Sequence, residues 1–186
     1  MTHDLLHRRV FVKSLSGVLL AALPVHALDS VLDKPREKAL YDEFSDEEKS
    51  LIKSSKLAQE IVGVREEGNN CAESVLTAVV RVLDRPEEIA HVAAPFGGGI
   101  GRFDLCGLLT GGHMALGLAA GMVHSDSAKF KSLARELSAK YWKWWTAWAP
   151  IHCHELRPNY DSEGFERMLQ RVAAKIEQLI EPALTL

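Results

Sequence analysis

Apolar residues at helical spacing, bounded by cap and stop signals, run through this chain from residue 45 onward. Ser45 is followed three residues later by Glu48, which is the pattern of a capping box and predicts a helix over residues 45–68. Asn70 begins a second predicted helix, which ends before Pro86. Further helical patterns cover residues 87–94, 104–121, 127–148 and 162–180. The sequence has no alternating strand pattern and no internal repeat, so we predict an all-α fold, a compact bundle of about five helices.

A glycine-rich loop separates two of these predicted helices. Residues 95–103 contain four glycines, at positions 97, 98, 99 and 101. Glycine adopts backbone conformations that other residues resist, so we expect a tight turn that lets two helices approach. A phosphate-binding loop is the alternative, but the segment follows no predicted strand and lacks the Lys-Ser or Lys-Thr pair of such loops. The sequence therefore favours a structural turn.

The amino-terminal segment has the features of an export signal. Arg8 and Arg9 precede a short apolar run and resemble the twin-arginine signal of bacteria. Val25 and Ala27 are small enough for a signal-peptidase site, so we predict cleavage after Ala27. An uncleaved, anchoring amino terminus is the alternative.

This signal divides the chain into a signal peptide at residues 1–27, a linker at 28–44 and a helical domain at 45–186. We expect the twin-arginine translocase to export the protein to the periplasm, a route that often carries proteins already loaded with a cofactor. The whole chain has 22 Lys and Arg against 25 Asp and Glu, a net charge of −3, and removal of the first 27 residues leaves −5. A mildly acidic protein without a clustered basic face is not expected to bind nucleic acid.

Two of the three cysteines are predicted at helix starts. Cys71 follows the cap residue Asn70, and Cys106 lies two residues after the predicted cap Asp104. Unpaired backbone N–H groups at a helix start favour the thiolate, which is both the nucleophile and the metal ligand. The alternative is that each cysteine is a small buried apolar residue, as most free cysteines are.

The third cysteine, Cys153, is predicted in a loop between His152 and His154. The cysteines are 35 and 47 residues apart along the chain. This spacing excludes the Cys-x-x-Cys patterns of thioredoxin-like, c-type haem and zinc-ribbon proteins. Any shared site is therefore assembled by the tertiary fold. Thiolates near imidazoles suit an iron–sulfur cluster, zinc or copper better than magnesium or calcium.

Four segments resemble a known family, at residues 70–76, 96–102, 106–111 and 153–156. Their order and spacing are similar to those of the redox-active family named for its C_GCAxxG_C_C cysteine pattern, and the likeness extends over about residues 57–179. The resemblance implies a compact helical domain in which Cys71, Cys106 and Cys153 hold a metal or an iron–sulfur centre.

The resemblance also implies a fourth ligand. The family's last cysteine is expected in the C-terminal helix, where this chain has Met168 near the corresponding position. His152, His154 and Met168 are the candidates for the fourth ligand. Gly107 and Gly111 lie in a small-residue segment that would let neighbouring groups approach the cofactor.

Two further segments are predicted to lie in the core. Residues 105–123 contain pairs of small residues four apart, as membrane helices do, but Thr110 and His113 interrupt the apolar run and favour a close-packed core helix. We expect His113 to be a buried, hydrogen-bonded histidine. An aromatic stripe is predicted to face the core or a dimer partner, with a lid over a redox centre and a membrane-interface belt as alternatives. It comprises Tyr141, Trp145 and Trp148.

Three hypotheses about function follow. The first is an exported redox or electron-transfer protein whose cysteine thiolates bind an iron–sulfur cluster, or another soft metal such as zinc, and which works with a redox partner protein. The second is a metal-free thiol protein with a disulfide between Cys71 and Cys106, in which Cys153 is free or links two chains in a homodimer. The third is a helical binding subunit that keeps its cysteines in the core. The sequence shows no nucleophile–base pair with an orienting third group, so a hydrolase is not expected.

Overall fold

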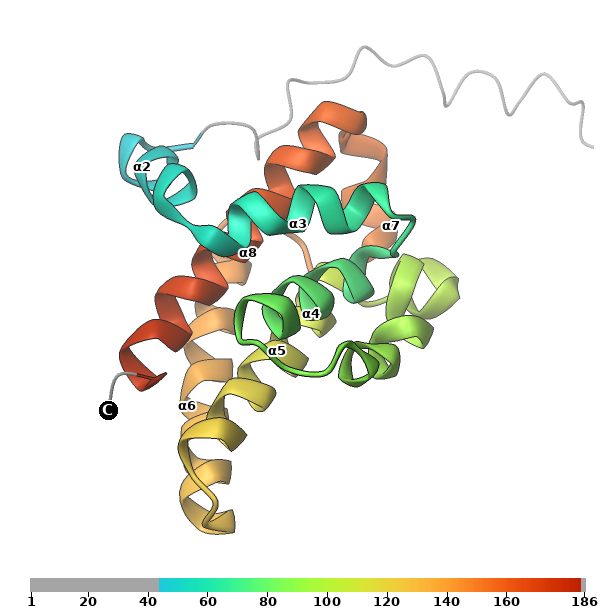
Figure 1. The fold of residues 1–186 in the computed structure, drawn as a ribbon. Helices are drawn as coiled ribbons and strands as arrows, with labels where there is room; N and C mark the ends of the chain where they lie inside the picture. The colour runs from blue at the N-terminus through green and yellow to red at the C-terminus, as the bar shows by residue number, and fades with distance from the viewer. Residues whose placement is uncertain (1–43, 185–186) are drawn as a thin grey trace, which may run out of the picture. The chain divides into compact units, whose positions relative to one another are not determined.

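The computed structural model describes residues 44–184, and helices make up most of this part of the chain (Figure 1). The predicted signal peptide, with Arg8 and Arg9, and almost all of the predicted linker lie outside the described residues. In the described part of the chain the α-helices are α2 (Asp46–Ser54), α3 (Lys56–Glu66), α4 (Cys71–Val82), α5 (Gly107–Val123), α6 (Ser127–Thr146), α7 (Cys153–Leu156) and α8 (Ser162–Leu184). The other helical segments are the 3-10 helices η1 (Glu87–Phe96) and η3 (Arg157–Asn159) and the π-helical turn η2 (Gly99–Phe103). The all-α prediction is confirmed, with more helices than the five expected.

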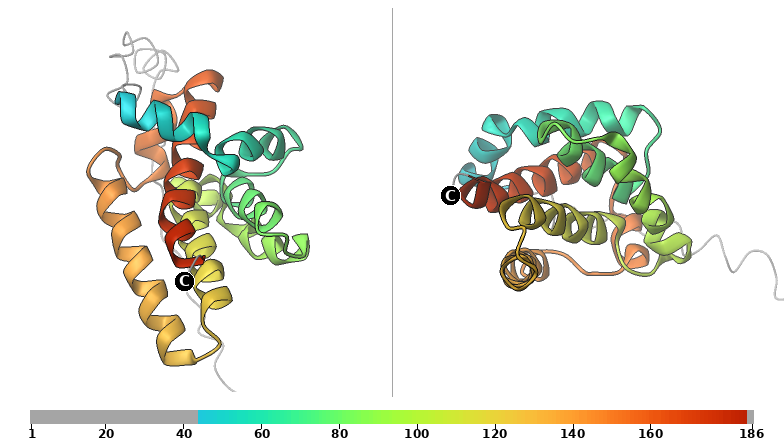
Figure 2. Two further views of the ribbon diagram at one scale, coloured as in Figure 1. Left: turned by 60° about the vertical axis from the view of Figure 1, so that its left-hand side comes forward. Right: turned by 60° about the horizontal axis from the view of Figure 1, so that its bottom comes forward.

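Helices α5, α6 and α8 pack against one another, and α3 and α4 pack against α8 and α5 on the side away from α6 (Figure 2). The aromatic stripe lies inside this arrangement, since Tyr141 and Trp145 are fully buried. The Tyr141 hydroxyl donates a 3.1 Å hydrogen bond to the carbonyl of Leu108 on α5. His113 packs edge-on against the Tyr141 ring, and its Nδ1 lies 2.6 Å from the hydroxyl of Ser138. The core prediction is therefore confirmed for Tyr141 and Trp145, whereas Trp148 is half-buried, and His113 is hydrogen-bonded as predicted but half-buried.

The predicted helix over residues 45–68 is broken at Ser55, which ends α2 and caps α3. The Ser55 hydroxyl donates to the carboxylate of Glu177 on α8 and accepts a 2.9 Å hydrogen bond from the amide of Ala58. The same carboxylate accepts a 3.1 Å hydrogen bond from the amide of Leu57. A continuous helix would have no free amide to offer Glu177, so α8 fixes the break.

Helices α4 and α5 approach each other backbone to backbone. A Cβ atom added at Gly111 would lie 2.8 Å from the Ala72 carbonyl oxygen, and one at Gly107 would lie 2.8 Å from the Cys71 Cβ atom. Only glycine permits this separation. The prediction of a close-packed core helix at residues 105–123 is supported, and within the described residues no helix is both long and apolar enough to cross a membrane.

Helix α5 begins at Gly107, with Cys106 as its N-cap, and not at the predicted Asp104. The reason is a single antiparallel bridge between Leu105 and His152. This pairing holds the backbone before Cys106 in a non-helical conformation. The Asp104 cap signal was therefore misleading, because a long-range contact overrides it.

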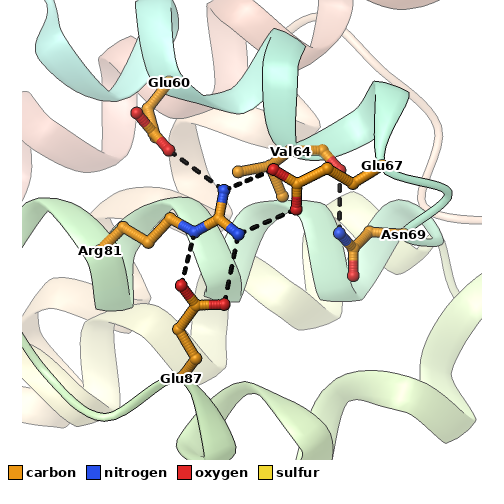
Figure 3. Close-up of polar contacts among 6 residues, drawn as sticks. All are labelled: Glu60, Val64, Glu67, Asn69, Arg81 and Glu87. Atoms are coloured by element: carbon orange, nitrogen blue, oxygen red, sulfur yellow. Dashed lines mark hydrogen bonds and ion pairs between the residues drawn. The ribbon is translucent and has the colours of Figure 1, made fainter.

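Arg81 on α4 forms ion pairs with three carboxylates of the surrounding segments (Figure 3). Its guanidinium donates two 2.8 Å hydrogen bonds to Glu67 after α3, and two of 2.9 and 3.2 Å to Glu87 in η1. A third carboxylate, Glu60 on α3, lies 3.3 Å away. These contacts hold the pKa of Arg81 above its usual range and lower the pKa of Glu67. The network fixes the turn from α3 into α4, at the point where Cys71 begins α4.

Candidate functional site

All three cysteines line one cavity of about 590 Å³. Cys71 begins α4, Cys106 caps α5 and Cys153 begins α7, so the sulfur atoms come from separate segments of the chain. Met168 of α8 lines the same cavity. We refer to this space as the cysteine cavity. The tertiary fold therefore brings together the residues that the sequence could only name separately.

Cys71 is held by the predicted capping box at Asn70. The Asn70 side-chain oxygen accepts hydrogen bonds of 3.0 and 3.1 Å from the amides of Ala72 and Glu73, and the Glu73 carboxylate accepts one of 3.0 Å from the Asn70 amide. The Asn70 side-chain amide also donates a 3.0 Å hydrogen bond to the carbonyl of Ala94. Cys71 is half-buried and lies in the first turn of α4, as predicted.

Cys106 and Cys153 are brought together by the bridge between residues 105 and 152. The Cys106 amide donates a 2.8 Å hydrogen bond to the Ile151 carbonyl, and the Cys153 amide donates one of 2.6 Å to the Asp104 carbonyl. Both side chains are buried, with 6% and 8% of their surface exposed. Cys153 begins the short helix α7 where a loop was expected, since the bridge orients the chain at this point.

The glycine-rich loop forms the wall beside Cys153. Gly98, with a φ of +58°, lines the cysteine cavity, and Gly99 has a φ of +62°. A Cβ atom at Gly99 would lie 2.8 Å from the Cys153 Cβ atom and 2.5 Å from the Asp104 amide nitrogen. The loop is a tight turn, as predicted. Because Gly99 has no Cβ atom, the Cys153 side chain fits beside it.

Burial raises the pKa of the Cys106 thiol to about 12. The backbone N–H groups of Leu108 and Leu109 act in the opposite direction, but burial outweighs them. Burial also raises the pKa of Cys153, a shift to which the nearby Cys71 adds and which Arg157 opposes. The sequence argument that a helix start favours the thiolate is therefore wrong in sign for Cys106, because the cost of desolvation exceeds the effect of the helix terminus.

Of the three candidates for a fourth ligand, Met168 is the one that lines the cysteine cavity, and it is only 3% exposed. His152 and His154 are not among the lining residues. The His152 ring is hydrogen-bonded to Asp104, and the His154 ring to the Phe103 carbonyl. The bridge therefore separates the imidazoles from the adjacent cysteine.

Gly107 and Gly111 are not among the lining residues either. Their contacts are with the backbone and side chains of α4, as described above. Their observed role is to set the distance between α4 and α5, and thereby the position of Cys71.

The three cysteines are free, so the predicted alternative of a disulfide between Cys71 and Cys106 is not formed here. In the described part of the chain no group of three or more His, Cys, Asp or Glu side chains is arranged to hold a single metal ion. A tetrahedral zinc ion needs every sulfur ligand about 2.3 Å from one point. The geometry therefore does not fit a mononuclear site.

Two arginines at the cavity were not predicted from the sequence. Arg157 lines the cavity, lies four residues after Cys153, and stacks 5.3 Å from the centre of the Phe103 ring. Arg65 also lines the cavity and stacks 5.7 Å from the centre of the Phe165 ring. The i, i+4 spacing of Cys153 and Arg157 is a signal that would have indicated Arg157. No local signal indicated Arg65.

Comparison with protein families gives one match. Residues 69–180 match the family described as "Putative redox-active protein (C_GCAxxG_C_C)", and this range includes all three cysteines and Met168. No curated protein and no solved structure matches the chain. The matched range covers more than half of the sequence, and the chain therefore belongs to the C_GCAxxG_C_C family of redox-active proteins.

Proposed function

We propose that this chain is an exported electron-transfer protein whose cysteine cavity holds an iron–sulfur cluster through Cys71, Cys106 and Cys153. The observation that carries the proposal is the lining of one cavity by three cysteines from distant segments, in a family described as redox-active. A bound cluster would supply one-electron oxidation and reduction. A redox partner protein would exchange the electron.

The size of the cavity and the type of its ligands favour a cluster over a single ion. Its volume of about 590 Å³ is roughly twenty times the share of one water molecule in the liquid, so a group of several atoms has room. In a cluster the cysteines bind different iron atoms, so their sulfurs need not meet around one point. Zinc is the weaker alternative at the cysteines, since no three His, Cys, Asp or Glu side chains of the described residues are arranged around one ion.

Several residues of the chain stabilise thiolates in this cavity. The N–H groups of Leu108 and Leu109 favour the charged form of Cys106, and Arg157 favours that of Cys153. Cys71 lies at the amino end of α4, where the helix dipole favours negative charge. Met168 offers a soft thioether as the fourth ligand.

The test is anaerobic reconstitution of the full chain with iron and sulfide, followed by iron and sulfide analysis and visible spectra before and after reduction. We expect stoichiometric iron and sulfide and an absorption that bleaches on reduction. Each of Cys71→Ser, Cys106→Ser and Cys153→Ser should lose the cluster. A colourless, iron-free protein that folds normally would overturn the proposal.

The fourth ligand is tested separately with Met168→Leu, which keeps the apolar volume but removes the sulfur. We expect a shifted reduction potential or a less stable cluster. Met114→Leu is the matched control, because Met114 lies on α5 and does not line the cavity. If the two variants behave alike, Met168 is not a ligand.

The second candidate function is a metal-free thiol protein, which the presence of three free cysteines at one cavity favours. Two of these thiols would form a disulfide by giving two electrons and two protons to an external disulfide or quinone acceptor, and the raised pKa values of Cys106 and Cys153 would slow the step, because the thiolate is the reacting form. Peptide mapping by mass spectrometry after aerobic purification distinguishes the two candidates. One intramolecular disulfide and no iron would support this second function.

Export to the periplasm with removal of residues 1–27 is part of the proposal and rests on the amino-terminal sequence. In a bacterial host, replacing Arg8 and Arg9 together by lysine should leave the full-length precursor in the cytoplasm. Lys34→Gln, which removes a charge in the predicted linker outside the signal, is the control. Amino-terminal sequencing of the periplasmic protein should begin at Leu28.

A further inference from the structure

A pair of histidine rings, those of His152 and His154, lies outside the lining of the cysteine cavity. The ring centres of His152 and His154 are 5.4 Å apart, and the ring planes are inclined by 28°. His154 is exposed, and the His152 side chain keeps 37% of its surface exposed. Neither ring is among the residues that line the cavity. The pair is therefore open to solvent and separate from the three cysteines.

Each ring uses the same nitrogen for a hydrogen bond to an oxygen. His152 Nδ1 lies 2.8 Å from the carboxylate of Asp104, and His154 Nδ1 lies 2.9 Å from the Phe103 carbonyl. A carboxylate and a carbonyl only accept hydrogen bonds, so each Nδ1 carries the proton. In a neutral imidazole the lone pair is then on Nε2. Among the described residues neither Nε2 has a hydrogen-bond partner.

We propose that His152 and His154 form a binding site for a divalent transition-metal ion, of the copper, nickel and zinc class. Imidazole nitrogen is the ligand type that these ions prefer, whereas calcium and magnesium prefer oxygen. Histidine ligands almost always donate their other N–H group to a carboxylate, a backbone carbonyl or water, which fixes the tautomer and the ring orientation. Asp104 and the Phe103 carbonyl supply this arrangement before any ion is bound.

The backbone holds the pair in a defined position. The Asp104 carbonyl accepts the 2.6 Å hydrogen bond from the Cys153 amide, between the two histidines in the sequence. The Asp104 side chain is 61% exposed and adds a negative charge beside the His152 ring. Two imidazoles make a site of fewer than three protein ligands, so water molecules complete the coordination. This inference does not depend on a cluster in the cysteine cavity, because the two sites use different residues.

The experiment is titration with Cu²⁺, which binds nitrogen ligands most strongly among these ions. The protein is the full chain with Cys71, Cys106 and Cys153 replaced by serine, since thiols reduce Cu²⁺, and with His3→Gln, since a histidine near the amino terminus would compete. Calorimetry gives the affinity, and electron paramagnetic resonance reports the nitrogen ligands. We expect one site with two imidazole nitrogens.

Variants in the same background assign the site. Asp104→Ala should lower the Cu²⁺ affinity about 10- to 100-fold, which is the usual cost of losing an outer-shell partner, and it keeps the backbone carbonyl that Cys153 uses. His152→Gln and His154→Gln should each lower it further. His91→Gln is the matched control, because His91 is an exposed histidine in η1. If His152→Gln and His154→Gln change the affinity no more than His91→Gln does, the proposal is overturned.

A second measurement applies if the serine variant does not fold. In the unmodified reduced chain, NMR during titration with Zn²⁺ follows the ring signals of each histidine, so that binding at the histidines is observed separately from binding at the thiols. Shifts of the His152 and His154 ring signals that saturate together support the site. Saturation of other histidines without these two would overturn it.

Discussion

The backbone amide of Cys153 donates a 2.6 Å hydrogen bond to the backbone carbonyl of Asp104, two residues before Cys106. This contact joins segments that are almost fifty residues apart, and it places two cysteines at one cavity. The two histidines that flank Cys153 are hydrogen-bonded to the same segment, His152 to the Asp104 carboxylate and His154 to the Phe103 carbonyl. The cysteine cavity and the histidine pair are thus built on the same bridge.

The sharp turn at Gly99 is expected to be essential for this arrangement. Gly99→Ala places a Cβ atom 2.8 Å from the Cys153 Cβ atom in a backbone with a φ of +62°. Gly101→Ala is the control, because its φ is +65° but nothing lies within 4 Å of the added atom. We expect about 1 kcal/mol of destabilisation for Gly101→Ala from the left-handed backbone. Gly99→Ala should cost about 1–3 kcal/mol more, from overpacking. Urea denaturation measures both, and equal effects would contradict the proposed contact.

Because α4 and α5 are in close contact, we expect alanine substitutions at two glycines of α5 to have opposite effects on stability. Gly111→Ala would bring a Cβ atom 2.8 Å from the Ala72 carbonyl oxygen, whereas a Cβ atom at Gly117 meets nothing within 4 Å. We expect Gly111→Ala to destabilise the fold by about 1–3 kcal/mol through overpacking. Gly117→Ala should stabilise it by about 0.5–1 kcal/mol, because alanine favours helix. Thermal unfolding measures the change in melting temperature of each variant. Changes of the same sign in the two variants would rule out the explanation by helix contact.

The three thiols should differ in reactivity in the metal-free protein. Cys106 is buried and has a pKa of about 12, so it is protonated at pH 8, whereas Cys71 is half-buried. We expect iodoacetamide to label Cys71 first and Cys106 last, as measured by peptide mass spectrometry over time. In urea the three should label at similar rates. Rapid labelling of Cys106 in the folded protein would contradict its burial.

His113 should make the stability depend on pH. Burial lowers its pKa in the folded protein, so below about pH 6.5 the unfolded chain takes up a proton that the folded protein resists. The stability should therefore be full above this pH and fall as the pH decreases towards the lower pKa of the folded state. His113→Asn removes the titrating group, so the difference in unfolding free energy between wild type and variant should change between pH 7.5 and 5.5. A constant difference would show that His113 does not contribute.

Local signals in the sequence predicted the helix starts that depend on neighbouring residues. The capping boxes at Ser45 and Asn70 are both formed, with their serine or asparagine and glutamate partners three residues apart. Tyr141 and Trp145 of α6 are buried as their spacing predicted. These features could be predicted because the interacting groups are close in the sequence.

The differences between the predicted and the observed helices come from contacts between residues that are distant in the sequence. Glu177 breaks the first predicted helix at Ser55, although the two residues are more than a hundred positions apart. The bridge from Leu105 to His152 moves the start of α5 from Asp104 to Gly107. No pattern within one segment contains this information.

By itself the sequence determined the helical class, the family and the three cysteines as the candidate site, because helical periodicity, caps and motif spacing are written along the chain. Only the tertiary structure decided which groups share a space. It placed Met168 at the cavity with the cysteines, and it left His152 and His154 out of the cavity lining. It also decided that Cys106 is a protonated thiol in the metal-free protein, because a pKa depends on burial in the folded protein more than on position within a helix.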